Sequence, residues 1–144
     1  PSSVEALDTS LHGQDLKNQE YVKYDLSGKD LGAADFTGSY FSVSSLKNSD
    51  LTGANMTNVI AYATRFDNAN LTNVNLTGAE LLKSIFDGAT IDGADFTDAV
   101  LDRSQQQKLC EVATGNTADS LGCSTTSAGY VPASKGQNTF NPGT

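Results

Sequence analysis

Apolar residues recur at every fifth position over most of the chain, from Leu16 to Leu101. This period matches neither the 3.6 residues per turn of an α-helix nor the two-residue alternation of a flat strand. A fixed short repeat is typical of a stack of near-identical units, each burying its apolar side against the next. The pattern therefore predicts one repetitive core built from these central residues: Leu16, Tyr21, Leu26, Leu31, Phe36, Phe41, Leu46, Leu51, Met56, Ala61, Phe66, Leu71, Leu76, Leu81, Phe86, Ile91, Phe96 and Leu101.

The residue two positions before each central residue is small or β-branched from Ala34 onward. An inward column with little space explains this limit, since extra methylene groups in a packed interior cost about 1–3 kcal/mol. Asp or Asn often precedes the central residue, and Gly or Asn often follows it by two positions, as at Gly38, Gly53 and Asn73. Such residues favour tight corners with unusual backbone angles. We expect each unit of five to turn a corner with two side chains inside.

Several units resemble the A-(D/N)-L-x-x motif of the pentapeptide-repeat family. Residues 69–73 (Ala-Asn-Leu-Thr-Asn) match it in full, and residues 54–58 and 94–98 match with Met or Phe at the centre. The resemblance covers residues 32–103. It implies an all-β fold, a right-handed quadrilateral β-solenoid (pentapeptide-repeat β-helix) with five residues on each face and twenty in each coil.

The chain is expected to divide into four parts: an N-terminal segment or cap over residues 1–13, the solenoid over 14–103, a helical C-terminal cap over 104–123 and an irregular tail over 124–144. The tail is rich in Ser, Thr, Gly, Asn and Pro. The first repeat units place larger residues in the small column, so we expect an irregular first coil or an end plugged by the N-terminal segment. These larger residues are Gln14, Gln19, Tyr24 and Lys29.

The cap is predicted to contain two short helices. Ser104 and Gln107 have the spacing of a capping box at a helix start, and Gly115 is expected to end that helix. A second helix is expected from Thr117 to Leu121.

Cys110 and Cys123 flank this region, and the single His12 is too distant in sequence to complete a four-ligand zinc site with them. A disulfide between them would stabilise the cap by about 3 kcal/mol. The alternative is two buried thiols, which are common in protein cores. We favour the disulfide, which implies an oxidising compartment.

The ending from Leu101 to Cys110, followed by a second cysteine, resembles the C-terminal cap of thylakoid-lumen pentapeptide-repeat proteins of plants and cyanobacteria. That resemblance implies a mature chain in the chloroplast thylakoid lumen after removal of a targeting peptide. The first residue, Pro1 in place of Met, agrees with this expectation.

The formal charge of −8 argues against nucleic acid as a direct ligand, because phosphate binding requires Lys and Arg. No apolar run approaches the roughly 20 residues of a membrane span, so membrane insertion is not expected. We find no catalytic constellation, cofactor motif or metal site. His12 lies between Asp8 and Asp15, where a solvated histidine is the better interpretation than an acid–base catalyst.

Two further surface patterns have simple explanations. The column Thr37, Thr57, Thr77 and Thr97 suggests an ice-binding ladder, but threonine also has good β-propensity, and sheet packing is the better interpretation. The glycosylation sequons at Asn55, Asn70 and Asn75 follow from the repeat motif itself.

One predicted side of the solenoid carries most of the large outward apolar residues, with Lys23, Lys83 and Arg103 at its margin. Contiguous exposed apolar surface usually marks a contact site, so this side is our candidate for an interaction. Either the C-terminal tail covers it through Tyr130, Val131 or Phe140, or it receives a protein partner or a second copy. We call this surface the apolar face, and it comprises Val22, Tyr40, Val43, Ile60, Tyr62, Leu82 and Val100.

The sequence favours a non-enzymatic structural or protein-interaction module with an unidentified protein partner, as a monomer or weak dimer. The alternative is an acidic DNA mimic that inhibits a topoisomerase or gyrase, as the family resemblance allows. Its carboxylates would come from two faces that bear Asp25, Asp67, Asp87 and Asp30, Asp50, Asp92. Lys47 and Arg65 interrupt one of these rows, and a disulfide would be out of place in a cytosolic inhibitor.

Overall fold

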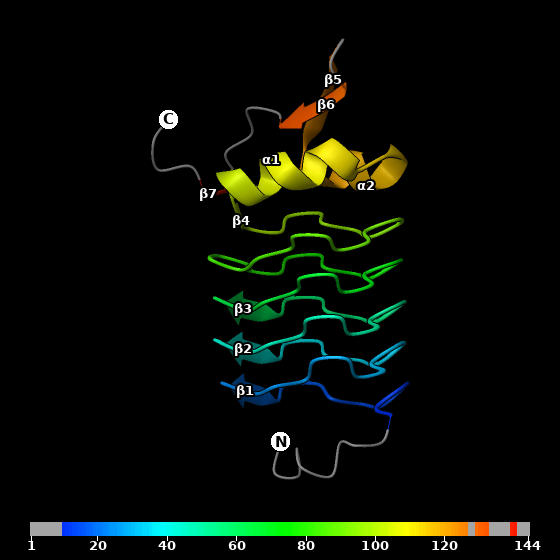
Figure 1. Ribbon diagram of the computed structural model, residues 1–144, viewed down its shortest axis with the longest axis vertical. Coiled ribbons are helices and arrows are strands. Elements are labelled where there is room, and N and C mark those ends of the chain that lie inside the picture. Colours follow the sequence, from blue (N-terminus) through cyan, green and yellow to red (C-terminus); the bar gives the residue numbers. More distant parts are fainter. Residues whose placement is uncertain (1–9, 127–128, 133–138, 141–144) are drawn as a thin grey trace.

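The computed structural model describes residues 10–126, 129–132 and 139–140, and the side chains of residues 10–123. Backbone hydrogen bonds join positions 19 or 21 residues apart, as in Leu16 N–H to Asp35 O (2.8 Å) and Asp35 N–H to Gln14 O (2.9 Å). Parallel bridges join residues 20 apart, such as Asp15 with Asp35. The chain thus returns above itself every twenty residues, and Figure 1 shows the resulting stack of rungs along the long axis.

Three short strands line one side of this stack. They are β1 (Glu20–Val22), β2 (Tyr40–Ser42) and β3 (Ile60–Tyr62). They form a parallel sheet in the order β1-β2-β3, with Tyr21 opposite Phe41 and Phe41 opposite Ala61. The strands are short because the chain turns a corner in every unit of five.

The corners explain the Gly and Asn residues of the repeat. Every fifth residue from Gly13 to Asp98 has a positive φ, between 51° and 75°. Gly, Asn and Asp tolerate this left-handed conformation best. Gly78 meets a second requirement, because a Cβ there would contact Oδ1 of Asn58 in the coil below. The expected corners are therefore present at the expected positions.

The core consists of the two inward columns that the sequence indicates. The central residues from Tyr21 to Leu101 are at most 3% exposed. Aromatic rings stack between adjacent coils, Tyr21 on Phe41 and Phe66 on Phe86, with 4.7 Å between centroids in both pairs. The second column is buried from Ala34 to Ala99 apart from the half-buried Ala89.

The coil pattern reaches further toward the N-terminus than the first periodic residue. Leu11 N–H donates to Asp30 O (3.0 Å), and Leu11 packs against the core. Gln14 in the small column is exposed, and the other three large residues there, Gln19, Tyr24 and Lys29, are half-buried. The first coil therefore has a more open second column than the coils above it. The expected plug lies mainly in residues 1–9, outside the described residues.

The surface threonines have a local role that differs from the expected sheet packing. Oδ1 of Asp35 accepts hydrogen bonds from both Thr37 N–H (3.0 Å) and Thr37 Oγ1 (2.6 Å). Asn55 binds Thr57 in the same way. The same bonds recur in other units. Asp or Asn followed two residues later by Thr therefore forms a turn in which the first side chain accepts hydrogen bonds from the Thr amide and hydroxyl.

Three inward serines form hydrogen-bond bridges to the coil below at units where that coil lacks its usual turn hydrogen bond. In most units the amide of the small residue donates to the central carbonyl three residues earlier. The amide of Thr64 instead donates to Ser84 Oγ (3.1 Å), and that hydroxyl donates to Ala61 O (2.6 Å). Ser39 and Ser44 bridge the coils below them in the same manner.

Ser84→Ala is expected to lower the free energy of unfolding by roughly 1–3 kcal/mol, because Thr64 N–H and Ala61 O lose their buried partner. Ser49→Ala is the matched control. The Ser49 hydroxyl binds Leu46 O, which also accepts from the Ser49 amide (3.2 Å), so that carbonyl stays satisfied. Urea unfolding measures both variants, and equal losses would contradict the bridging role.

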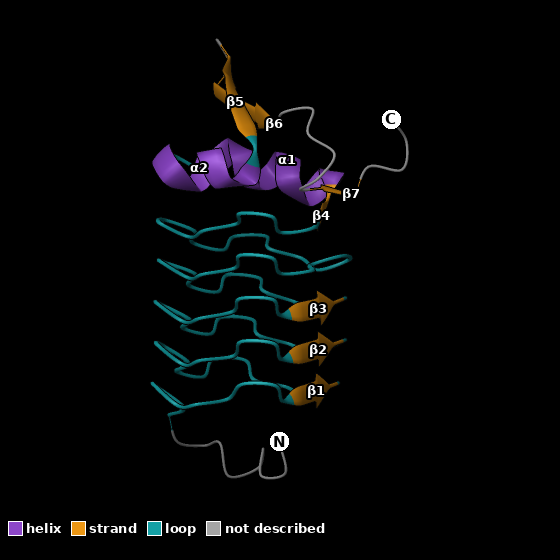
Figure 2. Cartoon of the chain, turned by 180° about the vertical axis from the view of Figure 1, so that it is seen from behind, coloured by secondary structure: helices purple, strands orange, loops and turns teal. Residues whose placement is uncertain are grey.

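Within the described residues, the last coil ends in a strand, and two helices and three further strands follow it. Strand β4 (Leu101–Asp102) leads directly into α1 (Arg103–Val112), and α2 (Gly115–Leu121) follows. β5 (Cys123–Thr126) pairs antiparallel with β6 (Gly129–Pro132), and β7 (Thr139–Phe140) pairs in parallel with β4. Figures 1 and 2 show the helices lying across the end of the stack, with β5 and β6 beyond them.

The helical cap gives hydrogen-bond acceptors to amides of the last coils. In lower coils such amides donate to backbone carbonyls of the coil above. Near the cap, Lys83 N–H donates to Asp102 Oδ2 (2.7 Å), Phe86 N–H to Gln105 Oε1 (3.2 Å) and Phe96 N–H to Ser120 Oγ (2.9 Å). Side chains of the cap thereby end a backbone ladder that would otherwise be an open edge.

Details of the predicted cap and tail were wrong. The N-cap of α1 is Asp102 and makes no side-chain capping bond, so the capping box at Ser104 does not form. The Asp102 carboxylate binds Lys83 of the coil below instead. Gly115 begins α2 rather than ending α1, and the expected irregular tail contains the three strands β5, β6 and β7.

Candidate functional site

The apolar face carries most of the large apolar side chains exposed in the described residues. Those side chains number six, and all except Val112 belong to the apolar face. Leu82 and Val100, in the coils nearest the cap, are half-buried. Strands β1, β2 and β3 bring together the residues that are 37% to 54% exposed: Val22, Tyr40, Val43, Ile60 and Tyr62.

The described strands of the tail do not lie over this face. β5 and β6 project beyond the helices, and β7 lies beside β4 as its parallel partner at the end of the stack (Figure 2). The expected cover by Tyr130 and Val131 therefore fails for β6, because its antiparallel partner β5 holds it at the cap. Phe140 lies opposite Asp102 in the β7–β4 pair, again at the cap.

Val43 is an unusual residue for its backbone conformation. Its φ is 52°, although β-branched side chains strongly disfavour positive φ. The side chain is 54% exposed, so burial gives little compensation for this strain. Other corner columns carry residues better suited to it, such as Asn58 and Gly78, whereas the corners directly below and above Val43 carry Lys23 and Ala63.

Val43→Asn is expected to raise the free energy of unfolding by about 1 kcal/mol, because Asn tolerates the left-handed region. The reciprocal change Ala63→Val places a β-branched residue at φ 51° in the next coil and is expected to cost a similar amount. Thermal unfolding of both variants tests the assignment. A Val43→Asn variant less stable than wild type would refute the strain.

Ion pairs and turns occupy many carboxylates of the two acidic faces. Arg65 forms a bidentate pair with Asp67 (2.8 and 2.7 Å), and Lys108 of α1 reaches Asp87 (3.4 Å). The Arg65 guanidinium lowers the pKa of Asp67, and hydrogen bonds from Ser27 lower the pKa of Asp25. These contacts break up the rows of free negative charge that a DNA mimic would present, so that alternative is not favoured.

His12 lies on the surface and contacts a carboxylate. Its Nδ1 is 3.1 Å from Asp30 Oδ1, and the two side chains are 61% and 47% exposed. Ser10 Oγ donates to the other oxygen of Asp30 (3.1 Å) and accepts from the His12 backbone amide rather than the ring. The Gly32 amide and His12 lower the pKa of Asp30 through hydrogen bonds. The His12 ring is thus exposed and paired with Asp30.

Asp15 pairs with a lysine, not with the histidine. Its carboxylate is 3.1 Å from the Lys17 ammonium, and hydrogen bonds from Lys17 lower the pKa of Asp15. Asp8 lies outside the described residues.

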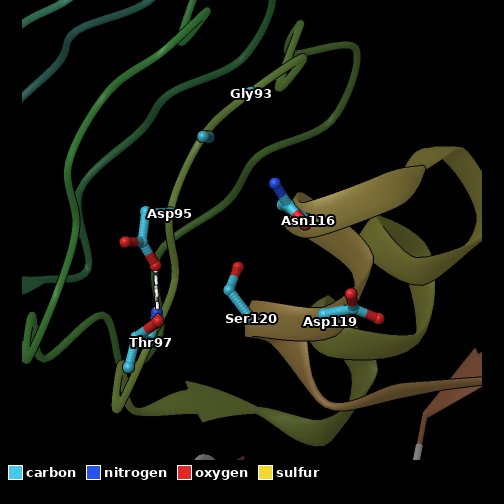
Figure 3. Close-up of a pocket in the computed structure, with 7 residues that line it drawn as sticks. Gly93, Asp95, Thr97, Asn116, Asp119 and Ser120 are labelled. Carbon is cyan, nitrogen blue, oxygen red and sulfur yellow. Dashed lines mark hydrogen bonds between the residues drawn. The ribbon is translucent and has the colours of Figure 1, made fainter.

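A hollow of about 530 Å³ lies between the last coil and α2. Gly93, Asp95, Asn116, Asp119 and Ser120 are among its lining residues, but Figure 3 shows the two carboxylates pointing away from each other. Asp95 is bound to Thr97, and Ser120 already connects Phe96 N–H with Thr117 O. Asp95, Thr97 and Ser120 thus serve the turn and the cap. Among residues 10–126, 129–132 and 139–140 no group of three potential metal ligands exists.

Tyr21 is the one buried titratable side chain of the β1–β3 coils. It is fully buried, and burial raises the pKa of its phenol to about 12. Its hydroxyl has no hydrogen-bond partner within the described part of the chain. The ring stacks on Phe41 and lies edge-on to Tyr24 and Phe36, so Tyr21 packs in the core.

Cys110 and Cys123 form a disulfide, the favoured of the two sequence alternatives. Their Cα atoms are 5.8 Å apart, within the normal range for such bonds. The bond ties α1 to the first residue of β5, and α2 lies between the two cysteines along the chain. A disulfide therefore cross-links the cap, as the sequence predicted.

The chain belongs to the pentapeptide repeat family, whose model matches residues 25–60 and 64–103 as eight copies of the repeat. Proteins of this family fold as right-handed β-solenoids and are generally structural or interaction modules. A comparison with curated proteins found no match. Within the described residues no helix has the length and apolar character needed to cross a membrane.

Several solved structures are similar to this chain. A pentapeptide repeat protein from the Arabidopsis thaliana thylakoid lumen is 33% identical, with 84% of this chain and 93% of that chain covered and a TM-score of 0.48. HetL, a heterocyst differentiation regulator from the cyanobacterium Nostoc, is 24% identical over 69% of this chain and 46% of its own (TM-score 0.46). The fluoroquinolone resistance protein QnrB1 is 20% identical over 64% and 67% (TM-score 0.26).

Proposed function

We propose that this protein is a non-enzymatic interaction module that presents the apolar face to another protein chain. The carrying observation is that five of the six exposed large apolar side chains in the described residues lie on this one surface. Monomeric soluble proteins rarely gather exposed apolar residues without a contact role. Tyrosine is enriched at protein interfaces, and Tyr40 and Tyr62 are both present.

The scaffold supports this role because its contact residues lie on a regular sheet. The stacked coils form a closed, right-handed, four-sided solenoid in this proposal, with the sheet β1–β3 on one of the four sides. Strand β2 is bonded to β1 on one edge and to β3 on the other, which holds its side chains in fixed register, so little conformational entropy is lost on binding. The strained Val43 corner adds an apolar side chain at the edge of the same sheet.

We place the mature chain in the thylakoid lumen. The Cys110–Cys123 disulfide supports an oxidising compartment, since structural disulfides are rare where glutathione keeps thiols reduced. A family member from that lumen is 33% identical in sequence to this chain.

The proposal is tested by affinity capture from thylakoid lumen extract with three baits: wild type, Tyr62→Asp and Val112→Asp. Val112 is the matched control because it is an exposed apolar residue (59%) at the end of α1, away from the apolar face. We expect a bound protein that Tyr62→Asp loses and Val112→Asp retains. Identical bound proteins for all three baits would refute the proposed contact surface.

A further inference from the structure

The apolar face is bordered by charges in a regular order. Glu20, Tyr40, Ile60 and Glu80 form one outward column, because each is paired with the residue twenty positions later. Over these four levels the first column has a carboxylate at the lowest and highest level and two apolar residues between, and Val100 of the apolar face follows Glu80 at the next level. All four side chains are exposed.

The corner column on the other border has the same order with opposite charge. Lys23, Val43, Ala63 and Lys83 occupy equivalent positive-φ corners of successive coils. Glu20 thus lies at the level of Lys23, and Glu80 at the level of Lys83. None of these four charged side chains has an ion pair with another described residue, so all are free for an external partner.

We propose that the apolar face is completed by a second copy of this chain, related by a two-fold axis parallel to the stack of coils. This inference rests on the proposed contact role of the apolar face. Such an axis keeps each level and exchanges the two borders, so Glu20 meets Lys23 of the second copy and Glu80 meets Lys83. At the levels between, Tyr40 meets Val43, and Ile60 meets the corner at Ala63. Tyr62 and Leu82 lie near the axis.

The opposite orientation is disfavoured by the same charges. A two-fold axis across the stack, placed between the Tyr40 and Ile60 levels, would keep each column and reverse the levels. Glu20 would then face Glu80, and Lys23 would face Lys83. Like charges in direct contact oppose association, so the charge pattern selects the parallel pair.

The size of the face indicates a weak dimer. A standard stable interface uses about 20–30 residues on each side, and the apolar face with its charged borders offers roughly half of that. The overall charge of −8 on each copy also opposes association at long range. We expect a dissociation constant on the order of 10–100 μM, with a dimer that forms at high local concentration.

A charge-swap experiment tests both the partner and the orientation. Sedimentation equilibrium of the full chain is measured from about 10 μM to 1 mM for wild type, Glu80→Lys and Lys83→Glu. Each single variant turns two symmetry-related attractions into repulsions, so we expect association about tenfold weaker than wild type. Mixed in equal amounts, the two variants should form a heterodimer at least as tight as the wild-type dimer, because every cross-pair is again opposite in charge.

Glu111→Lys is the control for Glu80→Lys, since it makes the same change in net charge at an exposed position of α1 and should leave association unchanged. Circular dichroism of each variant verifies the fold. A wild type that stays monomeric at 1 mM overturns the second copy as partner. The proposed function is tested separately, by the capture of another protein that Tyr62→Asp abolishes. Tighter association of Glu80→Lys would overturn the parallel orientation, because only the reversed pair places Glu20 of the second copy against residue 80. Failure of the mixture to associate overturns the pairing as well.

Discussion

Phe66→Ala is expected to lower the free energy of unfolding by about 3–5 kcal/mol. Phe66 is fully buried in the middle of the stack, and its ring lies parallel to Phe86 of the next coil (4.7 Å, 3° between planes). Its truncation removes apolar burial and the ring stacking, and the hydrogen-bonded coils on either side cannot collapse into the space. Denaturant unfolding followed by circular dichroism measures the loss.

Phe66→Leu provides the control for this cavity. Leu already occupies the same central column at Leu46 in the coil below, so the stack accepts its shape. We expect a loss of about 1–2 kcal/mol from the smaller volume and the missing ring contact. A Phe66→Ala variant that loses less than 1 kcal/mol would mean that the centre of the stack is not tightly packed.

The repeat could be predicted from sequence because each position has the same surroundings in every coil. A column seen many times reveals its requirement: a large apolar side chain at the centre, a small one two residues earlier, and Gly or Asn at the corner. Even Val43, which breaks the corner rule, could be placed there by counting in fives. The same counting gathered the apolar face into one surface, although its contact role stays a prediction.

The parts that sequence analysis missed depend on partners that no local pattern names. The hydroxyl of Ser84 binds backbone groups of Ala61 and Thr64, twenty or more residues earlier, and a serine among alanines gives no sign of this. The signal that could have found it is the inward column Ser44, Thr64 and Ser84, in which a hydroxyl side chain recurs every twenty residues.

The predicted capping box at Ser104 was wrong for a related reason. Ser104 and Gln107 satisfy a local helix-start pattern, but the last coil leaves amides that need acceptors, and Asp102 and Gln105 supply them instead. Tertiary demand at the end of the stack thus overrides the local capping preference. The pairing of β5 with β6 likewise could not be read from a segment rich in Ser, Thr and Gly.

Reduction of the Cys110–Cys123 disulfide is expected to destabilise the protein by about 3 kcal/mol, with the effect concentrated at the cap end. The bond closes a loop with a sequence separation of 13, and its loss restores the chain entropy of the unfolded cap. Gln105 and Ser120 then no longer stay fixed above the last coils, so the amides of Phe86 and Phe96 lose their acceptors.

Hydrogen exchange with and without reductant measures this effect residue by residue. The amides of Phe86 and Phe96 should exchange at least tenfold faster after reduction, because local opening of the cap exposes them. The amide of Met56 is the internal control, since it donates to Asn75 O inside the stack and has coils on both sides. Each coil contacts only the coils directly below and above it. The loss of protection at the cap end should therefore decrease with distance along the stack and not be equal in all coils. Equal acceleration at Met56 and Phe96 would show that the cap and coils unfold as one unit, and no acceleration at Phe96 would show that the helices hold their place without the disulfide.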